Sequence, residues 1–192
     1  PFIGIFSKVN YDSNLLIDFF QSSYTHRLIY FSVYQAFVSA ILSCFLAIPF
    51  ALALNRHKDL KIIKFIISLC GFCFVIPTIL IVYAVIKLYG NKGFFNSYFN
   101  LYEYLSIETI FGIKAILIAH TLLNTPFATR LFIQSLNSIP SKYYEISGSL
   151  NIKFLGNLIR LELPYIKQNF FIVFSIIFSL CFLSFAIVMA LG

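Results

Sequence analysis

Four long stretches of the chain carry no charged residue and are mostly apolar. They cover residues 28–55, 65–86, 115–129 and 168–192. A helix needs about 20 mostly apolar residues to cross a hydrocarbon core about 30 Å thick. The stretches therefore predict membrane-spanning helices in one domain, 1–192, at about 28–54, 62–88, 109–131 and 166–191. The expected fold class is an all-α integral membrane protein, a polytopic helical bundle.

Small and helix-bending residues refine this prediction. Four small residues recur at every fourth position of the first span, so they are predicted to share one helix face: Ser39, Ser43, Ala47 and Ala51. Small side chains let helix backbones approach closely within a bilayer. In the second span, Gly71 and Pro77 are expected kink points.

Composition agrees with a membrane protein. The chain is 60% hydrophobic and only 11% charged, whereas soluble domains carry about 25% charged residues. This excludes a cytosolic enzyme, a disulfide-stapled secreted domain and a disordered chain. All cysteines lie in the apolar stretches, where small buried thiols are expected rather than a redox pair: Cys44, Cys70, Cys73 and Cys181.

The net charge of +7 reports orientation, and no nucleic-acid partner is inferred from it. Lys and Arg are enriched in cytoplasmic loops. The segments 55–64 and 130–167 together hold nine of the 14 basic residues. Both are therefore predicted to be cytoplasmic, and the N-terminal segment external.

Three further features concern the segments predicted to lie on the external side of the membrane and the two ends of the chain. Phe94–Leu105 is rich in Phe and Tyr and is expected to anchor at the membrane interface, with contact to a ligand or docking protein as the alternative. Leu15–Phe20 is predicted to form a short amphipathic helix. Because the chain has no initiating Met and no polar tail, we expect it to be a fragment.

The predicted cytoplasmic loop, 132–165, carries the clearest local pattern. Pro140 suits the first turn of a helix, and Ser138 or Ser141 could cap it. The helix is predicted to end near Leu150, with Asn151 in a left-handed conformation. A second helix is predicted from Ile152 until Pro164 breaks it.

This loop resembles the cytoplasmic Glu-Ala-Ala loop of binding-protein-dependent ABC importer permeases. That pattern has a Gly six residues after the Glu, and Leu-Pro eighteen and nineteen residues after it. The matching positions here are Glu145, Asn151, Leu163 and Pro164. The chain departs from the pattern where Ile146 and Ser147 replace the alanines and Asn151 replaces the glycine.

The stretches His120–Pro126 and Cys181–Ala186 are similar to the thiamine-importing branch of this family. The resemblance covers about 21–192 and implies spans two to five of the first half of a two-half permease. It implies thiamine as cargo, with ferric iron as the alternative.

The resemblance also implies partners and site residues. The helix 140–150 would couple to a dimer of ATP-binding cassette subunits through Pro140, Glu145, Ser147, Gly148, Asn151, Leu163 and Pro164. Further implied partners are an external substrate-binding protein, the second permease half and the bacterial inner membrane, with no cofactor. The chain has no Gly-x-x-x-x-Gly-Lys pattern, so ATP hydrolysis is assigned to the ATPase subunit.

Polar groups within the predicted spans are candidates for the substrate path. His120 and Asn124 are four residues apart and share a helix face, although interhelical hydrogen bonding near Pro126 is an alternative. Tyr83 is a weaker candidate. No catalytic His-Glu-x-x-His or Gly-x-Ser-x-Gly pattern is present. An embedded enzyme is therefore disfavoured, and a non-transporting structural or regulatory subunit is the alternative of another class.

Overall fold

The computed structural model describes residues 21–90, 92–99 and 111–192, and within these ranges the regular structure is helical. The chain divides into two compact units, Pro1–Tyr34 and Gln35–Gly192. Helix α3 (Ser23–Arg56) begins in the first unit, where the rings of Tyr30 and Tyr34 stack with centroids 6.1 Å apart. The predicted helix at 15–20 lies outside the described residues.

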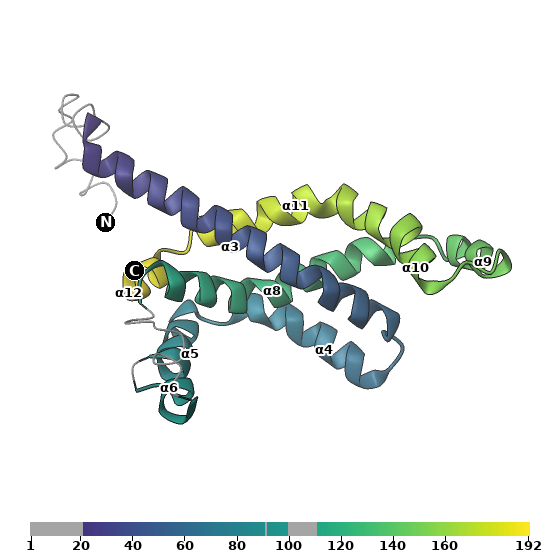
Figure 1. The fold of residues 1–192 in the computed structure, drawn as a ribbon, viewed down its shortest axis with the longest axis horizontal. Coiled ribbons are helices and arrows are strands. Elements are labelled where there is room, and N and C mark those ends of the chain that lie inside the picture. The colour runs from purple at the N-terminus through teal and green to yellow at the C-terminus, as the bar shows by residue number, and fades with distance from the viewer. Residues whose placement is uncertain (1–20, 91, 100–110) are drawn as a thin grey trace, which may run out of the picture. The chain divides into compact units, whose positions relative to one another are not determined.

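The second unit contains the remaining elements (Figure 1). In chain order after α3 they are α4 (Lys61–Phe72), the 3₁₀ turn η1 (Cys73–Val75), α5 (Thr78–Tyr89), α6 (Phe94–Phe99), α8 (Ile113–Asn137), α9 (Ser141–Ser149), α10 (Phe154–Asn157), the π-helical turn η2 (Leu158–Glu162), α11 (Leu163–Phe182) and α12 (Phe185–Leu191). The all-α membrane fold class is confirmed.

Within the described ranges, three continuous helical segments are long and apolar enough to cross a membrane: Ser23–Arg56, Ile113–Asn137 and Phe154–Phe182. The predicted span 62–88 is not one helix. It is divided into α4 and α5 because Ile76 is extended and Pro77 cannot donate a backbone hydrogen bond. The predicted span 166–191 is likewise interrupted at Leu183 and Ser184, between α11 and α12.

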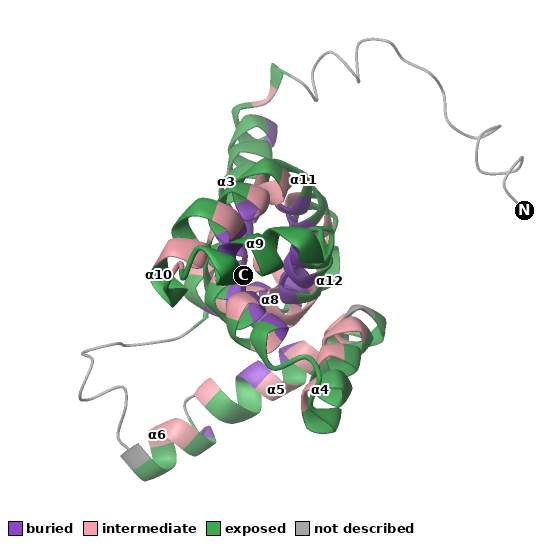
Figure 2. Ribbon diagram, turned by 90° about the vertical axis from the view of Figure 1, so that its right-hand side faces the viewer, coloured by how far each residue is buried: buried purple, intermediate pink, exposed green. Residues whose placement is uncertain are grey.

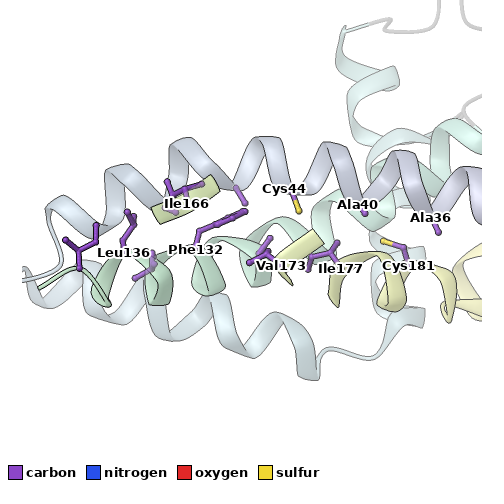
Figure 3. Packing of buried hydrophobic residues seen from close by; sticks show 14 residues of the cluster. Ala36, Ala40, Cys44, Phe132, Leu136, Ile166, Val173, Ile177 and Cys181 are labelled. Carbon is purple, nitrogen blue, oxygen red and sulfur yellow. The ribbon is translucent and has the colours of Figure 1, made fainter. Parts of the chain in front are cut away.

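The stripe of small residues on α3 lies in the core, as predicted. Ser39, Ser43, Ala47 and Ala51 are fully buried, and Ala36, Ala40 and Cys44 extend the same face. Figure 3 shows this face of α3 over larger side chains from α8 and α11, including Phe132, Val173 and Ile177. In Figure 2 the buried positions gather where α8, α11 and the Gln35–Arg56 part of α3 converge.

Aromatic rings on α11 contribute to the contact with α3. Phe170, Phe174, Phe178 and Phe182 stack along α11 with successive centroids 6.0–6.2 Å apart. Phe37 of α3 meets Phe174 edge-on at 5.5 Å. Since lipid supplies no hydrophobic force between helices, this close packing holds α3 on α11.

Enlarging a residue of the small stripe is expected to separate these helices. Ala47→Leu should lower the stability of the protein by about 1–3 kcal/mol through overpacking. Leu46→Phe adds volume on the exposed neighbouring face and should change stability by less than about 0.5 kcal/mol. Thermal unfolding in detergent measures both, and equal losses would refute the packing role of the stripe.

Part of the predicted interfacial segment is described. Helix α6 carries Phe94 and Tyr98, whose ring centroids lie 4.8 Å apart, while Phe95 packs on Tyr89 of α5 at 5.0 Å. Residues 100–105 of this segment lie outside the described ranges, as does the start of the span predicted from 109.

Candidate functional site

The loop helix α9 ends in a turn that its sequence dictates. Asn151 has a φ of 51°, in the left-handed region that Asn tolerates better than most residues. The Asn151 N–H donates to the Gly148 carbonyl, and the Ile152 N–H donates to the Ser147 carbonyl, both at 3.0 Å. These two bonds form a Schellman motif. The predicted left-handed end of this helix is therefore confirmed.

Helix α9 is attached to the chain at Ser147 and is otherwise largely exposed. Ser147 is buried and its hydroxyl bonds the side-chain oxygen of Asn157 in α10. Tyr143, Ile146 and Leu150 share a face by their helical spacing and are 50%, 46% and 67% exposed. Glu145 and Gly148 are also exposed. Helix α9 is thus held at its base and presents a partly apolar face.

The start of α9 differs from the prediction. Pro140 precedes the first helical residue as the N-cap, and no side chain caps the helix. The Ser138 hydroxyl instead donates to the Ser135 carbonyl at 2.7 Å, at the end of α8. Ser141 is already inside α9. Neither serine occupies the N-cap position, because Ser138 lies two residues before the N-cap Pro140 and Ser141 is the first helical residue.

Pro164 does not end a helix, contrary to the prediction. The Leu163 N–H bonds the Leu158 carbonyl five residues earlier, within the π-helical turn η2. Proline cannot donate to the carbonyl four residues before it, and its ring crowds that carbonyl. The wider π turn accommodates the proline, so the helix continues into α11.

An ion pair joins this turn to the end of α3. Arg56 Nη2 lies 2.9 Å from Glu162 Oε2, and Glu162 is only 5% exposed. The Arg56 guanidinium carbon also lies 3.9 Å from the centroid of the Phe154 ring. Nearby, Lys58 Nζ donates to Asn137 Oδ1 at 2.8 Å. The two segments predicted to be cytoplasmic therefore lie at the same end of the bundle.

Tyr144 connects α9 to this cluster. Its ring packs against the core, and it lines a polar cleft with Asn55, Arg56 and Glu162. Burial, and secondarily the Glu162 carboxylate, raises the pKa of Tyr144, while Arg56 opposes this. The phenol is therefore protonated at neutral pH and anchors the base of α9.

The ion pair predicts an asymmetric response to mutation. Arg56→Met leaves the buried Glu162 carboxylate without its guanidinium and should cost about 3 kcal/mol. Glu162→Leu leaves Arg56, whose side chain is 28% exposed, able to reach water, and should cost about 1 kcal/mol. The double variant should recover most of the loss. Thermal unfolding in detergent tests the order, and a larger loss for Glu162→Leu would contradict it.

A second cleft of about 240 Å³ lies against α8, where the two helix interruptions meet. Its walls are Cys73, Ile76 and Thr78 from the first interruption, Leu180, Leu183 and Ser184 from the second, and His120, Leu123, Asn124 and Phe127 from α8. Helix α12 also contacts both α5 and α8, as Figure 1 shows.

The structure brings together two of the three predicted path residues. His120 and Asn124 are buried on one face of α8 and line this cleft. Asn124 Nδ2 donates to Cys181 Sγ at 3.2 Å, which agrees with the interhelical alternative for that residue. Tyr83 is 60% exposed, with Lys87 Nζ 5.6 Å from its ring centroid. Tyr83 is not among the residues that line the cleft.

The sequence of the chain is similar to those of known membrane proteins. No protein-family model matches the chain. Over 90% of its length it is 36% identical to the thiamine transport system permease protein ThiP of Haemophilus influenzae. It is 33% identical, again over 90% of its length, to the proteins of the same name from Salmonella typhimurium and Escherichia coli. The chain is similar to these permeases. It spans about a third (32%) of their length.

Several residues of the two sites escaped prediction. Arg56 and Glu162 were not paired, since their separation of 106 positions gives no local signal. A carboxylate two residues before Pro164 was the available hint. Cys73 was expected to be a buried thiol but is partly exposed, and no role was predicted for Ser184, although Pro77 marked the first interruption. Among the described residues, no group of three or more His, Cys, Asp or Glu could hold a metal ion.

Proposed function

We propose that the chain is part of the membrane permease of an ATP-driven importer of thiamine, in the bacterial inner membrane. The cargo assignment is supported by the relatives, which are named thiamine transport permeases. The chain contributes helices of one permease half, and the rest of the longer protein supplies the second half. An external binding protein delivers the cargo.

The exposed face of α9 is the observation that carries the mechanism. Tyr143, Ile146 and Leu150 give it an apolar centre beside Glu145, at the end of the bundle rich in basic residues. A helix with such a face fits into a groove of a partner protein. In our proposal the partner is an ATP-binding cassette subunit, and Glu145 accepts charge-assisted hydrogen bonds from it.

The residues around α9 hold it in a fixed orientation for the proposed contact with the ATPase. Pro140 begins the helix, Ser147 ties it to Asn157, and Asn151 fixes the angle of the following segment. Gly148 is exposed, and an added Cβ there would meet open space. This position therefore leaves room for a close approach by the ATPase.

Movement of α9 has a continuous route into the membrane. The segment Phe154–Phe182 runs from α9 through the π turn and Leu163-Pro164 to the cleft. The Arg56–Glu162 pair ties the same turn to α3. Closing of the ATPase dimer would therefore tilt α11 and α3 together, and alternating access would follow as the cleft opens to each side in turn. His120 and Asn124 are the proposed path residues, and Tyr83 has a weaker claim.

Uptake of labelled thiamine and of ferric iron by a strain that carries only this transporter tests the proposal. We expect ATP-dependent accumulation of thiamine, not of iron, that requires the ATPase and the binding protein. A matched strain lacking the ATPase controls for passive entry. Accumulation of iron alone would overturn the cargo. Correct insertion without any uptake would instead favour a structural or regulatory subunit.

A further inference from the structure

The cleft against α8 is formed where two helical stretches lose regular structure, between α4 and α5 and between α11 and α12. After η1, Ile76 and Pro77 are extended, with ψ of 124° and 128°. Between α11 and α12, Ser184 has a φ of −81° and a ψ of 73°. Interrupted helices at membrane depth are tolerated where the irregular backbone lines a cavity. In transporters, such interruptions form substrate sites.

The polar groups of this cleft are not satisfied by the surrounding protein. His120 is fully buried, and neither ring nitrogen has a hydrogen-bond partner among the described residues. The buried Ser184 hydroxyl also has no hydrogen-bond partner among the described residues. Buried polar atoms normally find a partner. A neutral imidazole offers one donor and one acceptor, so His120 is equipped to bind a group that has both.

The volume and the lining of the cleft restrict which chemical group could bind His120. The cleft, at about 240 Å³, is smaller than the roughly 300–1,000 Å³ of sites that enclose a whole drug-sized ligand. It therefore has room for a single ring. Phe127, Leu123 and Leu180 provide an apolar wall, and an aromatic face also attracts a cationic ring.

We propose that this cleft is a transient binding site for one heteroaromatic ring of the transported cargo. The ring lies against Phe127, and its hydrogen-bonding edge meets His120 and Ser184. The inference rests on the proposed function and goes beyond it by assigning the position and the chemical class of the bound group. Asn124 is occupied by Cys181 and acts as a wall.

Two native cysteines provide a matched test. Cys73 lines this cleft, whereas Cys70 lines a separate apolar groove with Phe50 and Pro126. Both thiols are partly exposed, and Cys44 and Cys181 are buried. The full-length transporter, reconstituted with its ATPase and binding protein, is prepared as Cys70→Ser or Cys73→Ser. Cysteines outside this chain are replaced, and a small methanethiosulfonate reagent labels the one partly exposed thiol that remains, while Cys44 and Cys181 are buried.

In the Cys70→Ser transporter, thiamine should slow labelling of Cys73. At about ten times the half-protecting concentration the rate should fall about tenfold, and the labelled protein should lose uptake. In the Cys73→Ser transporter, thiamine should not change the labelling of Cys70. Equal labelling of Cys73 with and without thiamine, by a transporter that imports thiamine, would overturn the inference. So would failure to label Cys73 in every nucleotide state.

A second measurement addresses His120 directly. His120→Phe should raise the half-protecting thiamine concentration about tenfold, the effect of losing one hydrogen bond. His120→Gln keeps a donor and an acceptor and should restore part of the affinity. Equal half-protecting thiamine concentrations for the wild type and His120→Phe would contradict the proposed role of His120 in binding. Absence of thiamine uptake by the unmodified transporter would refute the proposed function itself, and with it the assigned cargo.

Discussion

Replacing Asn151 by proline is expected to abolish thiamine uptake while the protein still inserts into the membrane. Proline fixes φ near −65°, whereas Asn151 has a φ of 51°. Proline also removes the N–H that bonds the Gly148 carbonyl. The Schellman motif cannot form, so α9 would lose its fixed angle to the segment that follows. The proposed connection between the ATPase and α11 would then be lost.

Asn151→Gly is the matched control. Glycine adopts the left-handed conformation without strain and keeps the N–H, so this variant should transport at close to the wild-type rate. Uptake per inserted molecule, with insertion measured by surface labelling of the membrane protein, compares the two variants. Normal uptake by Asn151→Pro, or equal loss in both variants, would show that the turn does not transmit the movement.

Replacing Glu145 by lysine is also expected to abolish uptake, for a different reason. Glu145 is exposed, and substitution of an exposed residue usually changes stability by less than about 0.5 kcal/mol. The permease should therefore fold normally. Loss of one partner of a buried, hydrogen-bonded charge pair at an interface costs about 2–5 kcal/mol of binding, and a lysine at this position also brings a like charge against the donor. Copurification of the ATPase subunit should accordingly fall with uptake.

Two variants separate charge from other effects at this position. Glu145→Gln keeps the size and a neutral acceptor, so it should retain part of the uptake and of the ATPase binding. Lys153→Glu changes the charge at an exposed position beyond the end of α9 and should have a small effect. Full copurification of the ATPase with the Glu145→Lys variant would show that Glu145 does not contribute to the interface.

Local patterns predicted much of this protein. The four-residue spacing of Ser39, Ser43, Ala47 and Ala51 identified the buried face of α3, since a helical period depends only on neighbouring positions. The left-handed turn at Asn151 was predictable for the same reason, because few residues other than glycine tolerate that backbone conformation. Hydrophobicity alone determined the membrane fold class.

The tertiary structure decided what depends on residues distant in the sequence. Pro77 indicated a kink, but only the packing of α12 against α5 and α8 places this break opposite Ser184 and turns two interruptions into one cleft. The Arg56–Glu162 pair arises because the end of α3 meets the π turn. A local pattern cannot specify such contacts, since they depend on which helix faces the packed bundle buries. The sequence thus determined the helices and the turn after α9, and the packing decided where polar groups come together.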